Sequence, residues 1–314
     1  MTKKIGIVMD PIETITPYKD STLALMLAAQ KSGAELYYMV SDDLYIQDGH
    51  AYAAMGPLKV SDNLEKYYDL GETLYCKPLT DLDIVLMRKD PPVDKRFLHT
   101  CAMLEQAVRD GVRVINNPTM LITNNEKLYA TQFPEFCPPT LITSCNELLR
   151  GFRDKHEKII IKPLDSMGGD GVFMVTKDDV NFDVIWEMHT QRGTYPVVAQ
   201  KFIAAIDKGD KRIIIIDGEP FGHVLVRTPK DGSIRGNMAA GGSTHVAPLS
   251  PREHEIATAV GKSLKENDII FAGIDVIGDY LIEINITSPT GLRQISKECG
   301  VDVAALIMQK ILEI

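Results

Sequence analysis

The chain has 314 residues, of which 45% are hydrophobic and 25% charged, so it can bury a large core in two or three packed lobes. Its formal net charge of −9 argues against a surface that binds nucleic-acid backbones. The five cysteines are odd in number and form no C-x-x-C pair, which argues against a disulfide framework or a zinc ribbon. No apolar run is long enough for a membrane span or a signal peptide, so we expect reduced thiols in a cytoplasmic protein.

The first part of the chain alternates between strands and helices. Helices are expected from Asp20-Ser21 to about Gly33 and over residues 97–109. The segments with the apolar character of buried strands are residues 5–9, 35–40, 83–88 and 112–116. This alternation predicts a parallel, Rossmann-like α/β layer, which we expect to end near residue 122.

The rest of the chain has a different character. One helix is expected around residues 124–133, and β-rich segments joined by Gly-rich or Asp-Gly turns follow up to about residue 228, which indicates antiparallel hairpins. Ser250-Pro251-Arg252-Glu253 is a capping box that opens a helix to about Glu266. This part is therefore expected to be α+β. Gly261-Lys262-Ser263 resembles the end of a phosphate-binding Walker loop, but it lies inside this helix and lacks the preceding glycine.

The last hairpin, FAGIDVIGDYLIEIN, carries polar residues beside apolar ones. A two-residue turn at Gly278-Asp279 would pair Asp275 with Ile282 and mix charged and apolar side chains on both faces. A three-residue loop over 278–280 instead pairs Asp275 with Glu283 and leaves one face apolar. That face carries Ile274, Val276, Ile282, Ile284 and Ile286. Because register is set by keeping the apolar side chains on the core face, the sequence predicts the second pairing.

This register gathers Asp275, Glu283 and Asn285 on the opposite face. Two carboxylates so close repel each other, and a hard cation removes that cost. Carboxylate and amide oxygens are the ligands that magnesium prefers. The sequence therefore predicts a magnesium site, and the alternative is a solvated polar face near a turn.

Magnesium sites with few protein ligands commonly complete their shell with phosphate oxygens, so phosphate-binding groups are expected nearby. The segment 165–171, DSMGGDG, could direct backbone N–H groups at a phosphate, although a plain hairpin turn has the same composition. Lys162 leaves a strongly apolar strand, and Lys127 follows a polar helix start. Each lysine alone could be a solvated surface residue, but together these features predict a phosphate site.

Three arginines, Arg212, Arg227 and Arg235, lie in or beside a glycine-rich stretch. We expect residues 228–243 to form a mobile loop that could close over a reacting phosphate and exclude water. A surface loop without such a role is the alternative.

Taken together, these features resemble the ATP-grasp ligases and, closely, the prokaryotic glutathione synthetase family. The matching stretches run from residue 5 to residue 293 and include LMRKDPP, NNEKL, IIKPLDSMGGDGVF, RGNMAAGG, AGIDVIGD and EINITSPTGLR. The ATP-grasp part is generic, whereas MRKDPP, KPLDSMGG and RGNMAAGG are more specific to the synthetase family.

The resemblance implies an ATP-grasp fold with three parts. These are an N-terminal α/β domain over residues 1–122, a small lid over 123–203, and a C-terminal antiparallel-sheet domain over 204–314. ATP would lie between the last two. The chain would be cytoplasmic and would form a homotetramer, with no nucleic-acid or membrane partner.

The resemblance also implies roles for single residues. The metal ligands are Asp275, Glu283 and Asn285, and the catalytic arginines are Arg212, Arg227 and Arg235. The ATP-binding residues are Lys127, Lys162, Gly168, Gly169, Gln200, Lys201, Phe202, Ile203 and Asp210. The residues that hold the peptide substrate are Arg88, Asp90, Ser288, Thr290 and Arg293.

The implied activity is ligation of γ-glutamylcysteine with glycine through an acyl phosphate, with ATP and Mg²⁺ or Mn²⁺ as cofactors. One position departs from the family pattern, because Ser243 stands where an arginine is expected after AAGG. Two alternatives stay open. Another ATP-grasp ligase, similar to D-alanine–D-alanine ligase, would share the metal ligands but not MRKDPP or RGNMAAGG. A non-catalytic ATP-binding scaffold would lack turnover.

Overall fold

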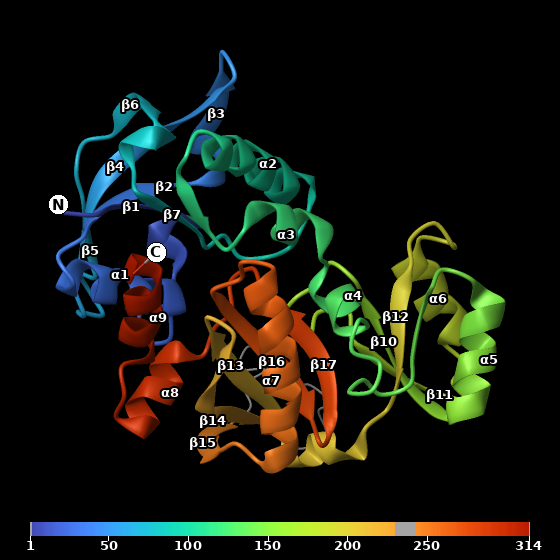
Figure 1. Ribbon diagram of the computed structural model, residues 1–314. Coiled ribbons are helices and arrows are strands. Elements are labelled where there is room, and N and C mark those ends of the chain that lie inside the picture. Colours follow the sequence, from blue (N-terminus) through green and yellow to red (C-terminus); the bar gives the residue numbers. More distant parts are fainter. Residues whose placement is uncertain (1, 230–242, 314) are drawn as a thin grey trace.

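The N-terminal part is built on a mixed sheet with the strand order β3-β4-β2-β1-β7-β8 (Figure 1). The computed structural model describes residues 2–229 and 243–313. The strands are β1 (Lys4–Val8), β2 (Glu35–Met39), β3 (Leu44–Gln47), β4 (His50–Val60), β5 (Tyr68–Leu70), β6 (Leu74–Pro78), β7 (Ile84–Met87) and β8 (Arg113–Ile115). Strands β2, β1, β7 and β8 pair in parallel, which confirms the expected layer. Strands β3 to β6 add an antiparallel extension that the sequence pattern did not predict.

Helices cover both faces of this sheet. The expected first helix is α1 (Ser21–Lys31), whose N-cap Asp20 accepts a hydrogen bond from Leu23 N, and it packs with the C-terminal helix α9 (Val303–Glu313) on one face. Helix α2 (Lys95–Arg109) covers the other face. The side chains of β7 alternate accordingly, since Ile84 and Leu86 face α1 and α9, while Val85 and Met87 face α2.

Two short helices cover residues 118–130, and the second of them corresponds to the helix expected around residues 124–133. Helix α3 (Pro118–Thr123) ends at Asn124, and α4 (Glu126–Ala130) begins after Asn125. The Asn125 side chain accepts hydrogen bonds from the N–H groups of Lys127 and Leu128 at 3.0 and 3.3 Å. An N-cap side chain binds N–H groups that have no partner at a helix start, so Asn125 begins α4 one residue after the expected start at Asn124. Glu126 and Lys127 thereby occupy the first turn of a new helix.

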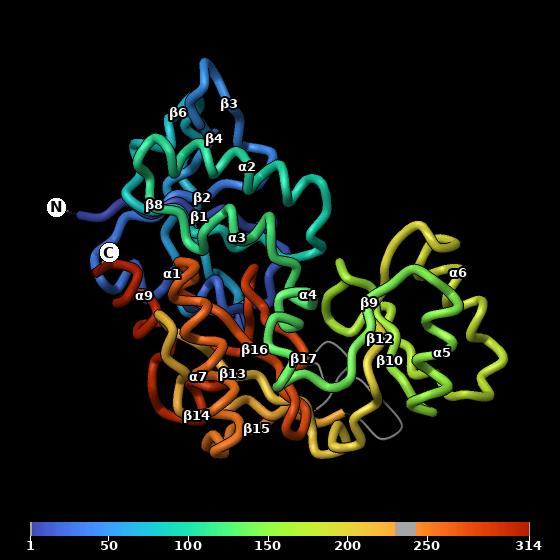
Figure 2. Tube along the Cα trace, turned by 45° about the vertical axis from the view of Figure 1, so that its right-hand side comes forward, coloured from blue at the N-terminus to red at the C-terminus, as the bar shows by residue number. Residues whose placement is uncertain are grey.

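The middle part is a small antiparallel sheet with two helices. Its strand order is β11-β10-β12-β9. The strands are β9 (Thr140–Thr143), β10 (Lys158–Pro163), β11 (Phe173–Thr176) and β12 (Val197–Lys201), and the helices are α5 (Asn146–His156) and α6 (Phe182–Thr190). Figure 2 shows these elements at one side of the molecule, apart from the N-terminal sheet.

The C-terminal part is a second antiparallel sheet with the strand order β15-β14-β13-β16-β17. The strands are β13 (Asp210–Ile216), β14 (Glu219–Thr228), β15 (Ser243–Pro248), β16 (Phe271–Ile277) and β17 (Tyr280–Asn285), and the helices are α7 (Pro251–Glu266) and α8 (Leu292–Cys299). The predicted capping box is confirmed, since Ser250 and Glu253 each bond the other's backbone N–H at the start of α7.

The apolar cores show which parts fold against each other. The middle part has a core of its own, built from residues such as Leu149, Ile161 and Val197. The N-terminal and C-terminal sheets share both remaining cores, because residues of each sheet occur in each cluster. Among the described residues, no helix is both long and apolar enough to cross a membrane.

Candidate functional site

The last hairpin, β16–β17, has the pairing that the sequence predicts. Asp275 lies opposite Glu283, and Ile274 lies opposite Ile284. Ile274 and Ile284 are fully buried, whereas Glu283 is partly exposed, so the apolar face lies in the core. Asn285 belongs to the same polar face, since its side chain lies 3.3 Å from Asp275 Oδ2. The three predicted metal ligands are therefore neighbours.

The extra residue that sets this register lies in the strand and not in the turn. The turn is Gly278-Asp279 alone, so the expected three-residue loop is wrong. The pairing shifts at Ile282 instead, which forms a β-bulge in β17. As a result Leu281 is fully buried in the core, while Ile282, which was expected there, is partly exposed.

Charged side chains of the C-terminal sheet form an alternating ion network. Arg212, on β13, donates Nε to Asp275 Oδ1 at 2.5 Å and Nη2 to Oδ2 at 2.8 Å. Arg227, on β14, places Nη2 3.0 Å from Asp275 Oδ1 and donates Nε to Asp210 Oδ1 at 2.6 Å. Each of these side chains is between 7% and 16% exposed. Since buried charges persist only when they are paired, the network fixes the direction of both guanidinium groups.

The same network sets the protonation of its members. Burial raises the pKa of Asp275, but Arg212 and Arg227 outweigh it and hold that pKa below its ordinary value. Burial dominates at Asp210 and raises its pKa, although Arg227 opposes the effect. Burial lowers the pKa of Arg227, and the two aspartates raise it above its ordinary value overall. Two fixed cations therefore lie beside an ionised Asp275.

The predicted metal ligands differ in how many protein partners their oxygens have. Both oxygens of Asp275 take two donors each, from Arg212, Arg227 and the Asn285 amide. Within residues 2–229 and 243–313, Glu283 pairs with Lys127 Nζ alone, at 3.6 Å. Asn285 directs its Nδ2 to Gly273 O at 3.1 Å, which leaves its carbonyl oxygen as the atom that could face a cation.

These residues fit a magnesium ion whose coordination shell is completed by phosphate and water oxygens. Among the described residues, no three His, Cys, Asp or Glu side chains cluster as a metal cage. Two carboxylates and an amide are hard oxygen donors that leave positions for phosphate and water, as magnesium sites commonly do. Asp275 is the one ligand that would have to share its oxygens with arginine.

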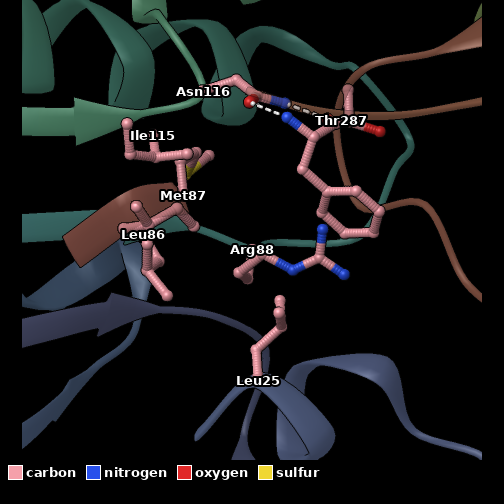
Figure 3. Close-up of a pocket in the computed structure, with 9 residues that line it drawn as sticks. Leu25, Leu86, Met87, Arg88, Ile115, Asn116 and Thr287 are labelled. Atoms are coloured by element: carbon pink, nitrogen blue, oxygen red, sulfur yellow. Dashed lines mark hydrogen bonds between the residues drawn. The ribbon is translucent and has the colours of Figure 1, made fainter. Parts of the chain in front are cut away.

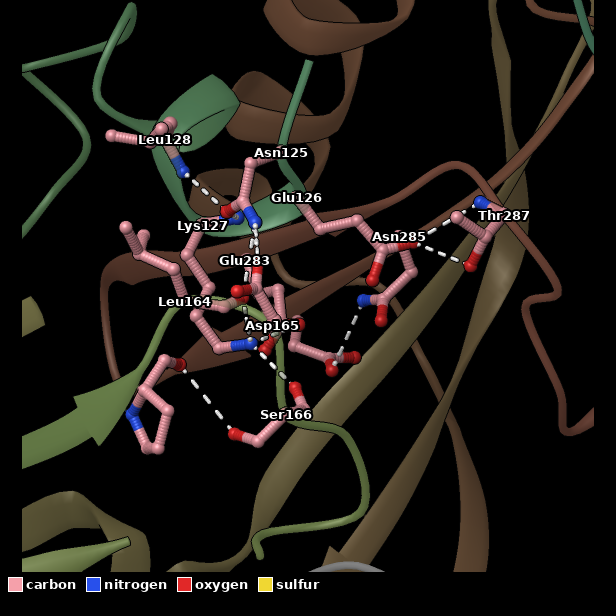
Figure 4. A network of polar contacts seen from close by, with 12 residues as sticks. Asn125, Glu126, Lys127, Leu128, Leu164, Asp165, Ser166, Glu283, Asn285 and Thr287 are labelled. Atoms are coloured by element: carbon pink, nitrogen blue, oxygen red, sulfur yellow. Dashed lines mark hydrogen bonds and ion pairs between the residues drawn. The ribbon is translucent and has the colours of Figure 1, made fainter. Parts of the chain in front are cut away.

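Two buried lysines lie near this polar face: Lys127, which Figure 4 shows beside Glu283, and Lys162, which interacts with the charges of Glu283 and Asp275. Lys127, on α4, donates Nζ to Leu164 O at 3.1 Å and to Ser166 O at 2.6 Å. Lys162, on β10, is 6% exposed, and burial lowers its pKa to about 8, with the charge of Glu283 acting in the opposite direction. An anion would restore the interactions that burial removes from these ammonium groups, so both are suited to hold phosphate.

The glycine-rich segment joins β10 to β11. Gly168 has φ +64°, Gly169 has φ +76° and Gly171 has φ +65°, a conformation that favours glycine. A Cβ on Gly171 would also approach Pro163 Cγ to 2.9 Å. The contacts of Lys127 with the carbonyls of Leu164 and Ser166 tie the start of this segment to α4, so both predicted phosphate-binding features are adjacent.

The segment 200–203 links the end of β12 to the strand β13, which begins at Asp210. Gln200 is buried and donates Nε2 to Thr140 Oγ1 at 3.1 Å. The Phe202 ring lies 4.3 Å from Lys158 Nζ. These contacts hold the link between the two antiparallel sheets in place. A contact of this segment with adenine, and of Asp210 with ribose, stays a prediction.

Arg88, predicted to hold the peptide substrate, is buried between the N-terminal and C-terminal sheets (Figure 3). Its Nε donates to Thr22 Oγ1 at 3.1 Å, its Nη2 donates to Pro289 O at 3.2 Å, and it lies over the Phe271 ring at 5.2 Å. Burial lowers its pKa to about 10, so it stays charged at neutral pH. A guanidinium has five N–H donors, so donors remain for a carboxylate.

Of the other predicted substrate residues, Ser288 and Thr290 lie in the turn after β17, Arg293 lies at the start of α8, and Asp90 follows β7. Ser288 donates Oγ to Arg88 O at 3.3 Å, and Thr290 is exposed. Arg293 is directed elsewhere, since its Nη1 pairs with Asp62 at 2.8 Å and its Nε donates to a carbonyl before α1. Asp90 is exposed after β7. The structure thus brings Ser288 to Arg88, and it gives Arg293 protein partners.

A cavity of about 10 Å³ lies beside Arg88 and Thr287. This volume suits about one water molecule, so the cavity is no binding place for a peptide. Arg235 lies outside the described residues, as does most of the expected loop 228–243. Ser243 is exposed at the start of β15, opposite Thr228.

Sequence reasoning missed two buried polar residues, Glu126 and Asn116. Glu126 precedes Lys127 and binds the backbone after β17, while Asn116 follows β8 and binds the backbone of both chains at the open end of the β16–β17 hairpin. The partners lie more than 150 positions along the chain in every case. The only available signal was that NNEKL places a carboxylate next to a phosphate-binding lysine.

Solved structures with similar folds include a synthetase and an ATP-grasp protein. The D-cycloserine synthetase DcsG superimposes with a TM-score of 0.71 at 14% identity, covering 99% of both chains. A RimK domain ATP-grasp protein from Sphaerobacter thermophilus superimposes with a TM-score of 0.64 at 16% identity, covering 98% of both chains. At these identities the likeness supports the fold alone.

Sequence relatives are much closer. Glutathione synthetase from Pseudomonas putida is 47% identical over 99% of this chain and 98% of its own, and that from Shewanella oneidensis is 47% identical over 98% of both. The family model "Prokaryotic glutathione synthetase, N-terminal domain" matches residues 3–121. The model "Prokaryotic glutathione synthetase, ATP-grasp domain" matches residues 126–300. The chain therefore belongs to the prokaryotic glutathione synthetase family.

Proposed function

We propose that this protein joins γ-glutamylcysteine to glycine at the expense of ATP, which gives glutathione, ADP and phosphate. Family membership over almost the whole chain supports the reaction. The observation that carries the proposal is the convergence of Lys127 and Lys162 with Asp275, Glu283 and Asn285. This convergence supplies phosphate-binding cations and oxygen ligands at one place.

ATP would bind where the two antiparallel sheets meet. Lys127 and Lys162 would hold its phosphates, with backbone N–H groups of Gly168 and Gly169 as further donors. The segment 200–203 would border the adenine, and Asp210 would share its carboxylate between Arg227 and the ribose. What supports this placement is the burial of both lysines and their position between the glycine-rich segment and Glu283.

The dipeptide would bind at the turn after β17, held by Arg88, Asp90, Ser288, Thr290 and Arg293. Arg88 is the strongest candidate, because a buried guanidinium with spare N–H donors favours a carboxylate over a neutral group. Thr290 is exposed, and its carbonyl oxygen lies 3.5 Å from Arg212 Nη1, which connects this turn to the ion network.

The reaction would proceed in two displacements. An oxygen of the cysteinyl carboxylate attacks the γ-phosphorus of ATP, the bond to the β-phosphate oxygen breaks, and ADP leaves. The amine of glycine then attacks the acyl carbon, phosphate leaves with the carbon–oxygen bond electrons, and the amine loses a proton. Arg212 and Arg227, held by Asp275 and Asp210, would stabilise the negative charge that develops on the transferring group and on the acyl oxygen.

Asp275, Glu283 and Asn285 would hold magnesium, or manganese in its place. The ion supplies charge neutralisation at the phosphates of the nucleotide. Asp275 and Glu283 would act as its carboxylate ligands, and Asn285 would offer its carbonyl oxygen. We also propose that the protein works in the cytoplasm as a homotetramer, in line with its family.

The test is an ADP-release assay on the purified protein with magnesium. ADP release should require γ-glutamylcysteine and glycine together, because the acyl phosphate forms only on the dipeptide and is consumed by the amine. The products should include glutathione, which mass spectrometry identifies. ADP release driven by D-alanine in place of both substrates would point to a different ATP-grasp ligase, and ATP binding without turnover would point to a scaffold.

A further inference from the structure

Glu126 is a buried carboxylate whose contacts lie at the end of strand β17 (Figure 4). Its Oε1 accepts hydrogen bonds from Ile286 N at 2.9 Å, Thr287 N at 3.0 Å and Thr287 Oγ1 at 2.8 Å. The strand ends at Asn285, so these N–H groups belong to the first residues beyond the sheet ladder. Glu126 therefore binds the chain where it passes from the candidate metal ligands to the candidate dipeptide site.

Asn116 binds the same place from the other side. Its Nδ2 donates to Ile286 O and to Phe271 O, both at 2.7 Å, and its Oδ1 accepts from Phe271 N at 3.2 Å. The N–H and the C=O of Ile286 are thus each held by a side chain from outside the sheet. This arrangement fixes both the position and the orientation of the chain after β17.

A carboxylate at this position costs free energy, because it is buried near another carboxylate. Glu126 is 8% exposed, and burial together with the nearby charge of Glu283 raises its pKa. A neutral amide could accept the same hydrogen bonds without the repulsion from Glu283. An ionised carboxylate would add strength, because hydrogen bonds to an ionised acceptor are about twice as strong as those between neutral groups.

The next residue in the chain connects this contact to the phosphate site. Lys127 binds the carbonyls of Leu164 and Ser166 and lies 3.6 Å from Glu283. Two consecutive side chains of α4 thus hold the turn after β17 and the start of the glycine-rich segment. The distance between these two segments depends on α4.

We propose that Glu126 is a positioning residue for the ligase reaction. Its contacts fix the position of the dipeptide-binding turn relative to the phosphate-binding Lys127. The inference rests on the proposed function. Glu126 touches neither substrate in this scheme and acts through Ile286, Thr287 and Lys127. Loosening its contacts should therefore impair the alignment of carboxylate and γ-phosphate more than the binding of either.

Glu126→Gln tests this inference, because it keeps the size of the side chain and removes the charge. We expect kcat to fall about 10- to 100-fold, since small errors of alignment cost rates of that order. The KM values for ATP and for γ-glutamylcysteine should change less than about threefold, since every group that contacts a substrate is retained. A purely structural role would lower the amount of folded enzyme and leave the kcat of the folded fraction unchanged.

Glu253→Gln is the matched control. Glu253 is 2% exposed and accepts a backbone hydrogen bond from Ser250 N at 2.8 Å, but it caps α7 and lies outside the site. This variant should keep kcat within about twofold of wild type even if its thermal midpoint falls as far as that of Glu126→Gln. An equal loss of kcat in both variants would overturn the inference, as would an unchanged kcat in folded Glu126→Gln.

Thr287→Val provides a second arm. It removes one of the donors to Glu126, the hydroxyl group at 2.8 Å, and leaves the backbone donors intact. Its loss of kcat should be smaller than that of Glu126→Gln, and the double variant should lose less than the product of the two, because both changes act through one contact. If the loss of kcat in the double variant equals the product of the two single losses, Glu126 and Thr287 act independently. That outcome would contradict the inference. A wild-type protein that makes no glutathione would refute the proposed function instead.

Discussion

At the scale of single residues, the two carboxylates of the candidate metal site have different surroundings. Asp275 is bound by two guanidinium groups and an amide and carries the charge that neutralises Arg212. Glu283 is 18% exposed and has one long ion pair with Lys127. It also repels Glu126, so its favourable and unfavourable interactions partly cancel. Even if Asp275 and Glu283 both bind the metal, we expect them to contribute unequally to the free energy of unfolding.

Asp275→Asn should lower the free energy of unfolding by about 3 kcal/mol, because removing one partner leaves buried guanidinium charge uncompensated. Glu283→Gln should change it by about 1 kcal/mol or less, since the lost attraction to Lys127 is offset by relief at Glu126. Urea denaturation followed by circular dichroism gives both values.

Both variants should nevertheless lose glutathione formation, because each removes a carboxylate from the candidate metal site. Turnover that survives in Glu283→Gln would remove this residue from the site. A Glu283→Gln protein that is as unstable as Asp275→Asn would contradict the difference inferred from their contacts.

At the scale of secondary-structure elements, the Walker-like tripeptide in α7 has a structural explanation. Gly261 faces the β13–β14 turn, and a Cβ on it would lie 2.0 Å from Gly218 O. Real Cβ atoms do not approach a backbone oxygen so closely, so the helix can pack on the turn only with glycine at this position. The glycine is a packing residue of α7 and no part of a phosphate loop.

Gly261→Ala should lower the free energy of unfolding by about 2 kcal/mol, because overpacking against backbone outweighs the better helix propensity of alanine. Gly151→Ala in α5 is the control, since its Cβ would meet nothing within 4 Å. That variant should raise the free energy of unfolding by about 0.5 to 1 kcal/mol. Urea midpoints that move in the same direction for both variants would contradict this account.

At the scale of the whole molecule, the division of the apolar cores leads us to expect two bodies that open separately. The N-terminal and C-terminal sheets share their cores, and the last helix, α9, packs against α1. The middle part keeps a separate core under α5 and α6. Parts without a shared core can open on their own.

Native-state hydrogen exchange should therefore separate the two bodies. Amides of β10 and β12 should exchange through an opening that requires less free energy than the opening of β1, β7, β13 and β16. Amides of the N-terminal and C-terminal sheets should exchange through openings that require the same, higher free energy. A single value for all of these strands would show that the middle part is no separate unit, and distinct values for the two larger sheets would show that the shared cores do not couple them.

Much of this architecture is predictable from local sequence signals. The capping box at Ser250 and the N-cap Asp20 mark the starts of α7 and α1, because both act within three residues of the helix start. The Asp275–Glu283 pairing follows from the need to bury Ile274 and Ile284. The resemblance to a family supplied the nucleotide and substrate residues, and their roles stay predictions.

The features that sequence reasoning missed depend on distant parts of the chain. The bulge at Ile282 and a longer turn give the same pairing from Glu283 onward, and Leu281 and Ile282 are both apolar, so the pattern alone does not distinguish them. The contacts of Glu126 and Asn116 depend on partners that only the folded chain brings near. The helix start expected at Asn124 and Asn125 is the start of α4, but the short helix α3 before it was not predicted.

The two lysines that we expect to bind phosphate lie in different parts of the chain. Lys162 lies on β10 of the middle part, whereas Lys127 lies on α4, whose neighbour Glu126 is anchored to the C-terminal sheet. A nucleotide bound by both lysines would connect the two parts of the chain. Each phosphate that it loses would weaken this connection. The departure of products and the separation of the two bodies would then be one event, driven by the same loss of negative charge.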